Sequence, residues 1–415
     1  MMQRIRFALP AALSCGLLLL AMSCGGGGSS SASNTSGSGG STSTTNAVAV
    51  SVNNGISPDF AYVNGIFVSV TVCQPGTSIC VTVPNVLLDT GSSGLRLLSS
   101  SLTGISLTNA TSGGSTLANC RQYVDNSYSW GPVATADVKL GDEVASSVPI
   151  QIIAEQNYTF PAAPASCGAT AVNSVNALGT NGFLGLGFYP QDCGSNCVTT
   201  AAPGFYYACG SSSCTETTAQ LAQQVQNPIG MFASDNNGFV LTMASVPAGG
   251  SASSTGTLTF GIGTQSNNAL GSATILTPNA YGDFTTTFNG TTTQGFIDSG
   301  SNTLNFLDSA ATGIPQCTGT YIQYYCPAST EALTATNTGN NGVTSTVSFN
   351  VANAQTLLSG NNKVFSNLAG AGDNTTVTPN FLYFAWGAPF FYGRSVFMAL
   401  EGQNAGGTPG PYWAY

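Results

Sequence analysis

Histidine is absent from this 415-residue chain, and charged residues make up only 6% of it. Without histidine, the chain cannot build a Ser-His-Asp or Cys-His nucleophilic system or a histidine-ligated metal site. Seven Lys and Arg oppose 16 Asp and Glu, so the formal net charge is −9 and no basic patch is available for nucleic acid. Any hydrolytic chemistry would therefore have to come from carboxylates, and we expect no metal and no cofactor.

The plentiful residues indicate an exported protein built from strands. Gly, Ser, Thr and Asn abound, while Val, Ile, Phe and Tyr recur in short alternating runs that are broken by Gly, Pro and Asn. The chain is long enough for two domains with substantial cores. The composition therefore predicts an all-β protein.

The beginning of the chain predicts export and attachment to a membrane. Residues 1–23 carry two arginines and then an apolar run, which is typical of a secretory signal peptide and too short for a convincing permanent span. The sequence before Cys24 resembles a bacterial lipobox, although Ala21 stands where that motif usually has Leu; simple cleavage and an uncleaved anchor are the alternatives. Residues 24–46 form a Gly/Ser/Thr-rich tether. We expect a lipid-anchored protein of the bacterial cell envelope, at the outer membrane or in the periplasm.

Two short segments of the chain repeat one pattern. Residues 86–98 read VLLDTGSSGLRLL, and residues 296–307 read FIDSGSNTLNFL. In each, an apolar strand delivers an aspartate, Asp89 or Asp298, into a turn of Thr or Ser, Gly and Ser. Hydroxyl and amide groups in such a turn can hold a carboxylate by hydrogen bonds, and two similar turns could meet across a pseudo-twofold axis.

These segments resemble the two active-site loops of the pepsin-like aspartic proteases. Each lobe of that family also has a later strand in which two hydrophobic residues precede a Gly, as at residues 183–185 and 385–387 of this chain. The resemblance implies an all-β, bilobal, pseudo-twofold symmetric fold with a cleft between an N-terminal lobe, residues 47–230, and a C-terminal lobe, residues 231–415. The chain also resembles a family of bacterial exported proteins of unassigned function that have this arrangement.

The resemblance implies an exported endopeptidase that hydrolyses peptide bonds with two carboxylates and a water molecule. Asp89 and Asp298 would be the catalytic pair, and they would share a proton because two adjacent carboxylates cannot both ionise readily. We expect a peptide or protein substrate in the cleft, a monomer, and no membrane contact beyond the lipid anchor. The residues expected to brace the loops and orient the carboxylates are Thr90, Gly91, Ser92, Ser299, Gly300 and Ser301.

Two features depart from the pattern of that family. A hairpin that presents a tyrosine to the substrate is expected over residues 122–141, but more than one aromatic residue lies there and sheet packing is the alternative for each. The candidates are Tyr123, Tyr128 and Trp130. Where the family usually has Trp after the first loop, this chain has Arg96, which could pair with an acidic group, favour an ionised Asp89, or lie on the surface.

Ten cysteines follow the tether, and an even number in an exported chain indicates disulfides. Neighbours in the sequence suggest four pairs and leave a fifth by elimination. The pairs are Cys73–Cys80, Cys193–Cys197, Cys209–Cys214, Cys317–Cys326 and Cys120–Cys167. A thiolate metal cluster is the alternative, but the spacings are scattered and no histidine would complete it.

Three functions are compatible with these observations. An endopeptidase is favoured by two intact aspartate loops. A non-catalytic pepsin-fold binding protein on the bacterial envelope is favoured by Arg96 and the ambiguous hairpin. The third is a surface or adhesion module in which the lipid anchor and tether matter and the cleft does not.

Overall fold

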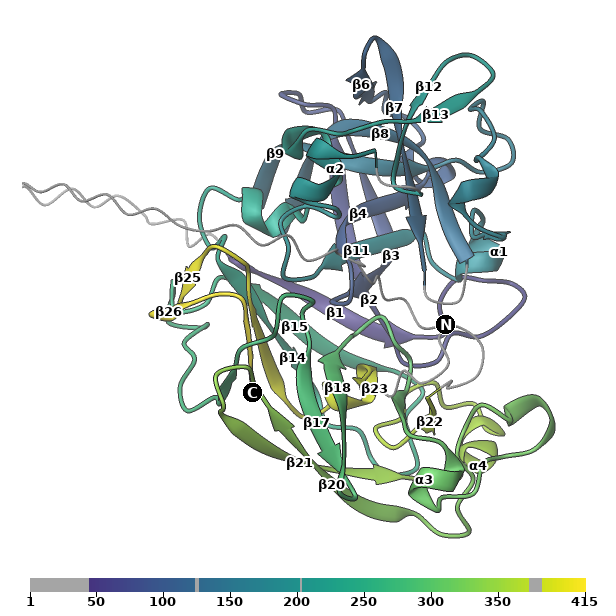
Figure 1. Cartoon of the computed structure of the whole chain (residues 1–415), viewed down its shortest axis with the longest axis vertical. Coiled ribbons are helices and arrows are strands. Elements are labelled where there is room, and N and C mark those ends of the chain that lie inside the picture. The colour runs from purple at the N-terminus through teal and green to yellow at the C-terminus, as the bar shows by residue number, and fades with distance from the viewer. Residues whose placement is uncertain (1–44, 124–126, 202–203, 373–382) are drawn as a thin grey trace, which may run out of the picture.

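The computed structural model describes residues 45–415 except 124–126, 202–203 and 373–382. The predicted signal peptide, Cys24 and nearly all of the predicted tether lie outside the described residues. Strands dominate and helices are short, so the all-β prediction is confirmed (Figure 1). The α-helices are α1 (Val175–Leu178), α2 (Ser195–Thr199), α3 (Ser309–Thr312) and α4 (Ala354–Leu358). In the described part, none of the helices has the length and apolar character needed to cross a membrane.

The first aspartate stands at the end of a buried strand. β3 (Cys80–Asp89) is buried over its last four residues, and β4 (Ser93–Leu98), which leaves the turn, is buried throughout. β11 (Gly182–Leu186) runs parallel to β3, with Gly185 opposite Asp89, and antiparallel to β4. β11 therefore lies between the two arms of the aspartate loop and fixes both.

The second aspartate is held by the same arrangement. β18 (Thr291–Ile297) ends one residue before Asp298, and β19 (Leu304–Phe306) follows the turn. β23 (Tyr383–Trp386) pairs parallel with β18 and antiparallel with β19. Both strands predicted from a hydrophobic-hydrophobic-Gly pattern thus pack beside their aspartate loops. Both halves of the chain repeat one topology around an aspartate, as the bilobal prediction requires.

One continuous sheet joins the beginning of the chain to its end. β1 pairs with β2 and β15, β15 with β14, β14 with β24, β24 with β27, and β27 with β16. In Figure 1 its members β1, β14 and β15 run along the junction between the purple to teal half and the green to yellow half. These pairings cross residue 230, and the lobe limits given above stay a prediction. The strands are β1 (Ala47–Asn53), β2 (Gly65–Cys73), β14 (Gly238–Met243), β15 (Ser254–Phe260), β16 (Ile275–Leu276), β24 (Ser395–Ala399) and β27 (Tyr412–Ala414).

A long hairpin, β7 (Ser115–Gln122) and β8 (Ser127–Leu140), arches from the first half of the molecule. It begins earlier than the predicted residues 122–141, because its first strand starts at Ser115, and β8 continues into the large sheet beside β9. The other strands are β5 (Thr108–Asn109), β6 (Thr111–Ser112), β9 (Glu143–Ile153), β10 (Thr170–Ala171), β12 (Tyr206–Cys209), β13 (Cys214–Glu216), β17 (Phe284–Phe288), β20 (Glu331–Thr338), β21 (Thr344–Val351), β22 (Ala369–Ala371), β25 (Asn404–Ala405) and β26 (Thr408–Pro409).

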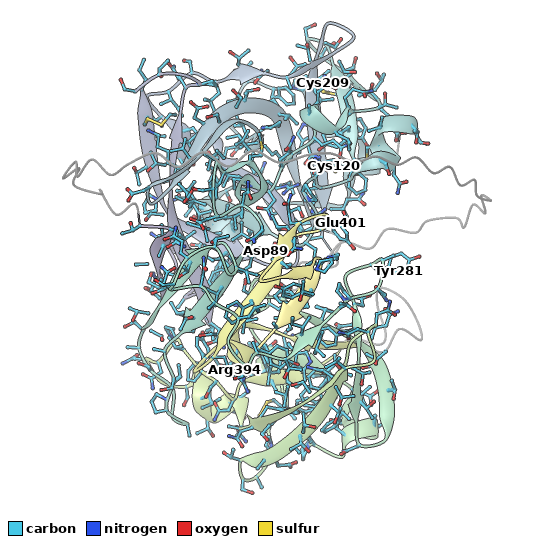
Figure 2. All side chains as sticks on the ribbon, turned by 90° about the vertical axis from the view of Figure 1, so that its left-hand side faces the viewer. Asp89, Cys120, Cys209, Tyr281, Arg394 and Glu401 are labelled. Atoms are coloured by element: carbon cyan, nitrogen blue, oxygen red, sulfur yellow. A yellow bond between two sulfur atoms is a disulfide. The ribbon has the colours of Figure 1, made fainter. Side chains whose placement is uncertain are left out.

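All five predicted disulfides are present. Cys73–Cys80 closes the β2–β3 hairpin, and Cys209–Cys214 closes the β12–β13 hairpin. Cys120–Cys167 ties β7 to the loop before β10 (Figure 2). Disulfides of this number belong to an oxidising compartment, so they indicate an extracytoplasmic protein.

Candidate active site

Asp89 is held by the turn that follows it. Its Oδ1 accepts a hydrogen bond from the backbone N–H of Gly91 at 2.9 Å, and its Oδ2 accepts one from the Ser92 hydroxyl at 2.5 Å. The carboxyl group is fully buried, at the level where the two halves of the molecule meet (Figure 2). Both oxygens are therefore oriented by donors that the Asp-Thr-Gly-Ser turn supplies.

Asp298 is held in the same way by the second turn. Its Oδ1 accepts from the N–H of Gly300 at 2.9 Å, and its Oδ2 accepts from the Ser301 hydroxyl at 2.7 Å. This side chain is also fully buried. The two aspartates thus have equivalent environments in two segments that are far apart in the sequence.

The two turns are bonded to each other through the residues that follow the aspartates. The Thr90 Oγ1 accepts from the Ser299 N–H at 2.9 Å, and the Ser299 Oγ accepts from the Thr90 N–H at 3.1 Å. Each hydroxyl also donates across the interface, Thr90 to the Ile297 carbonyl at 3.4 Å and Ser299 to the Leu88 carbonyl at 2.7 Å. Four reciprocal bonds therefore fix one loop against the other.

The glycines of the turns let the carboxyl groups face each other. A Cβ atom on Gly91 would lie 2.8 Å from Cγ and Oδ1 of Asp298, and one on Gly300 would lie 2.8 Å from Oδ1 of Asp89. No real side chain tolerates such distances, so each turn needs glycine for this close approach. The structure therefore brings together all eight residues of the two predicted Asp-Thr/Ser-Gly-Ser turns, with the carboxyl pair at the centre.

Proximity and burial make the pair hold a proton. Burial, followed by the charge of Asp89, raises the pKa of Asp298 from its usual 3.8 to about 8, although the bonds from Ser301 and Gly300 act in the opposite direction. The proton is a property of the coupled pair rather than of one residue. Around neutral pH the pair can therefore offer one acid and one base.

A family model matches residues 42–415 of the chain and is described as "Protein of unknown function (DUF3443)". The chain belongs to this family. No curated protein matches the sequence. Among solved structures, this DUF3443 chain is similar to the crystal structure of an aspartic proteinase from Irpex lacteus, with 16% sequence identity over 89% of this chain and 96% of that one and a TM-score of 0.48.

Among the three hairpin aromatics of this DUF3443 chain, Tyr123 lies on the face that points toward the aspartates. Its hydroxyl and that of Ser129 are 3.1 Å apart, and its ring centroid lies 5.7 Å from that of Phe183 on β11. Phe183 and Leu87 belong to one buried cluster with Tyr123, and they flank the strands that hold the first aspartate loop. Tyr123 is thus the hairpin aromatic that packs beside the strands of the first aspartate loop.

The other two aromatics pack away from the aspartates. Trp130 donates its indole N–H to the Pro161 carbonyl at 2.8 Å and packs edge-on against Tyr207, with centroids 5.3 Å apart. Tyr128 packs against the same cluster, which surrounds the Cys120–Cys167 disulfide. The alternative of sheet packing therefore describes Tyr128 and Trp130.

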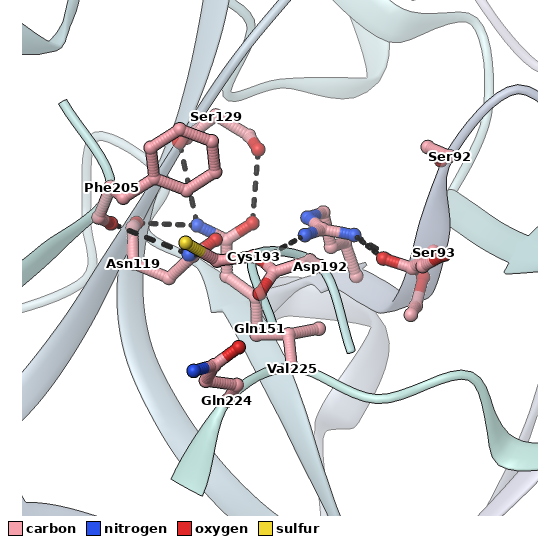
Figure 3. Close-up of polar contacts among 12 residues, drawn as sticks. Ser92, Ser93, Asn119, Ser129, Gln151, Asp192, Cys193, Phe205, Gln224 and Val225 are labelled. Atoms are coloured by element: carbon pink, nitrogen blue, oxygen red, sulfur yellow. Dashed lines mark hydrogen bonds and ion pairs between the residues drawn. The ribbon is translucent and has the colours of Figure 1, made fainter. Parts of the chain in front are cut away.

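Arg96 is buried, so the surface alternative is wrong. Its Nη2 forms an ion pair with the Oδ2 of Asp192 at 2.7 Å, which confirms the predicted pairing with an acidic group (Figure 3). Its Nη1 donates to the Ser93 carbonyl at 2.7 Å. Asp192 also accepts from Asn119 at 3.1 Å and from the Tyr206 hydroxyl. Arg96 therefore connects the end of the first aspartate loop to a buried polar network beneath the hairpin.

No sequence motif marks Tyr62, which lies near the aspartate pair. It lies in the loop before β2, which begins at Gly65. The ring packs edge-on against Phe67, with centroids 5.4 Å apart. Burial and then the charges of Asp89 and Asp298 raise the Tyr62 pKa, so its phenol stays neutral next to the pair.

Asp192 and Arg121 were also missed. The sequence offers one signal for them, the small number of charged residues. In such a chain, a charged residue next to a cysteine, as at Asp192–Cys193 and Cys120–Arg121, is a candidate for a buried charge. Arg121 lies on β7 and is fully buried. The described residues bring no three His, Cys, Asp or Glu side chains together in the geometry of a metal site.

Removing a bracing hydroxyl should weaken the contact between the loops. Thr90→Val or Ser299→Ala leaves buried N–H and C=O groups without partners, so each should lower the free energy of unfolding by about 1–3 kcal/mol. The double variant should cost less than the sum, because both residues serve one network. Urea unfolding measures this effect. As a control, Thr71→Val removes an exposed cross-strand hydroxyl contact and should change the free energy of unfolding by less than about 0.5 kcal/mol. If Thr71→Val costs as much stability as Thr90→Val or Ser299→Ala, the bonds between the two loops have no special role.

The raised pKa of Asp298 also has a consequence for stability. A group whose pKa is higher in the folded state binds its proton more tightly there, so it stabilises the fold at low pH and this contribution is lost as pH rises from about 4 to about 8. Asp298→Asn keeps the shape without the charge. We expect its melting temperature to exceed that of the unchanged protein by several degrees at pH 7–8, and the gap to close near pH 4. A gap that is independent of pH would show that the native pair does not retain a proton.

Proposed function

We propose that this protein is an exported aspartic-type endopeptidase that hydrolyses peptide bonds with Asp89 and Asp298. The single observation that carries the proposal is the reciprocal bracing of two equivalent loops around a facing pair of buried carboxyl groups. A buried pair of acids is costly to keep ionised, so its contribution to stability is lost as the pH rises towards 8. Such a pair is suited to proton transfer, because it can hold one proton between two carboxyl groups.

In the proposed reaction, a water molecule lies between the two carboxyl groups and the peptide carbonyl. The ionised carboxylate takes a proton from the water as its oxygen bonds to the carbonyl carbon, while the protonated carboxyl gives its proton to the carbonyl oxygen. The resulting gem-diol collapses when the protonated carboxyl gives its proton to the amide nitrogen and the C–N bond breaks. The other carboxylate takes the proton of one gem-diol hydroxyl, so the products are an amine and a carboxylic acid, and the pair again holds one proton. Ser92 and Ser301 hold the outer oxygens, so the inner oxygens keep their orientation toward the water.

A second candidate is a binding protein with the same architecture and no turnover. It is favoured by the complete burial of both carboxyl groups, since water and peptide must reach them for hydrolysis. In this case the cleft would hold a peptide without cleaving it.

The mature protein, purified as the cell exports it, should be incubated with a denatured protein from pH 3 to 7, with and without pepstatin. Cleavage that pepstatin suppresses supports the endopeptidase. Peptide binding without cleavage at any pH supports the second candidate. If neither cleavage nor peptide binding occurs, both proposals fail and a surface module is left.

We further propose lobes over residues 47–230 and 231–415 and a monomeric protein that is held at the envelope by a lipid on Cys24. The five disulfides support export. A flexible tether over residues 24–46 would let the folded part reach substrates near the outer membrane or in the periplasm.

A further inference from the structure

Arg121 lies on the inner face of the hairpin that covers the first aspartate loop. It is opposite Ser129 in the β7–β8 ladder and is 1% exposed. Because alternate residues of a strand share a face, Arg121 has Asn119 and Tyr123 as its neighbours on this side of β7. Asn119 bonds to Asp192, and the Tyr123 and Ser129 hydroxyls lie 3.1 Å apart, so the face that carries Arg121 is polar. Figure 3 shows Asn119, Ser129 and Asp192 of this network.

None of the three guanidinium nitrogens of Arg121 has a hydrogen-bond partner among the described residues. The Nε of Arg96 is also buried without a partner, whereas only one acceptor of this network, the Oδ1 of Asn119, is left over. A buried donor without an acceptor costs free energy, and a charged one costs more. The space beneath the hairpin therefore has an excess of donors and one positive charge that the network does not bond.

The nearby anions are already in use. Asp192 faces both arginines, but its oxygens are bonded by Arg96, Asn119 and Tyr206. Asp89 attracts Arg121 through space, but its oxygens are bonded within its own loop. Burial and then the charge of Arg96 lower the Arg121 pKa to about 10, so the guanidinium is still a cation at neutral pH.

We propose that Arg121 binds a carboxylate of the peptide beside the aspartate pair, so that the site prefers peptides with an acidic group near the bond to be cleaved. A planar guanidinium matches a carboxylate with two parallel N–H···O bonds. One unbonded positive charge suits one negative charge, and Asp89 and Asp192 would repel a doubly charged phosphate. The class of substrate rests on the proposed function, whereas the carboxylate site itself does not.

A small pocket lies at the junction between the two halves, next to the Arg96–Asp192 ion pair. Its walls include Gly91 and Ser92 of the first aspartate loop, Tyr281 of the other half, and Asp192, whereas Arg121 is not among its lining residues. Asp192 is the ion-pair partner of Arg96, the arginine next to Arg121. A peptide in this pocket would therefore lie beside Asp192, and its carboxylate would pass the Arg96–Asp192 ion pair to reach Arg121.

The experiment compares matched peptides for binding to the mature protein at a pH where they stay intact. The peptides share one sequence with blocked ends and carry Glu or its neutral isostere Gln at successive positions; one further peptide has a free C-terminal carboxylate and no Glu. In fluorescence anisotropy we expect a carboxylate at one position to bind about tenfold tighter than its neutral counterpart. Either a side-chain or a terminal carboxylate supports the site, and the preferred peptide identifies which one it takes.

Arg121→Gln should abolish the preference, and Arg121→Lys should keep part of it, since a lysine retains the charge without the planar fork. Lys139→Gln, which removes a positive charge from the far part of β8, should leave the preference unchanged. Because Arg121 is unbonded, we expect Arg121→Gln to melt at the same or a higher temperature than the unchanged protein; if it fails to fold, Arg121→Lys alone decides. The proposal is overturned if the Glu and Gln peptides of every pair bind with affinities within twofold of each other. It is also overturned if the preference for the carboxylate persists in Arg121→Gln or is undiminished in Arg121→Lys. A preference without cleavage refutes only the peptidase, and cleavage without a preference refutes only the carboxylate site.

Discussion

Asp89→Asn and Asp298→Asn should each lower kcat/KM for peptide cleavage by roughly 10⁴-fold. An amide side chain of the same shape can neither take a proton from water nor give one to the peptide carbonyl. The local geometry should survive, because Asn can still accept from the Gly300 N–H at position 298, or from the Gly91 N–H at position 89, and bond to the serine of its loop. Both variants should therefore lose chemistry and retain peptide binding.

This loss can be distinguished from unfolding. Asp298→Asn is expected to be more stable than the unchanged protein at neutral pH. It should therefore lose peptidase activity while its melting temperature rises. Asp59→Asn changes an exposed carboxylate and should keep full activity. Initial rates over a range of substrate concentrations, followed by mass spectrometry of the products, measure the effect. Residual cleavage above 10% in either aspartate variant would exclude the two-carboxylate mechanism.

Breaking the Arg96–Asp192 ion pair should give the largest loss of stability. Asp192→Asn leaves two buried arginines without an ionised partner, and Arg96→Met leaves Asp192 without its cation. Uncompensated buried charge costs about 3–5 kcal/mol, so each single variant should lose roughly that much. Arg96 also donates to the Ser93 carbonyl, and its loss should loosen the end of the first aspartate loop.

The double variant Arg96→Met with Asp192→Asn completes a mutant cycle. It should recover part of the loss, because no member of the pair is then left charged and alone. Guanidinium unfolding at pH 7 gives the three free energies, and Asp59→Asn is the exposed control. If the stability losses of the two single variants add up to that of the double variant, the 2.7 Å ion pair between Arg96 and Asp192 contributes no net interaction energy.

The sequence alone was sufficient for the features that depend on local signals. An apolar strand that runs into Asp-Thr-Gly-Ser constrains its own turn, because the amide and hydroxyl that hold the carboxylate lie two and three residues after it. The same holds for four of the disulfides, whose cysteines are close neighbours in the chain. The all-β class follows from composition in the same manner.

The tertiary structure decided every contact between segments that are distant in the chain. Nothing local to Arg96 indicates that its partner is Asp192, and nothing in the strand around Arg121 indicates that its guanidinium is buried without one. Tyr62 acquires its place beside both aspartates only when the two halves close on each other. A residue's neighbours along the chain determine its hydrogen bonds within a turn, whereas its burial and its electrostatic surroundings are set by segments that folding brings in from elsewhere.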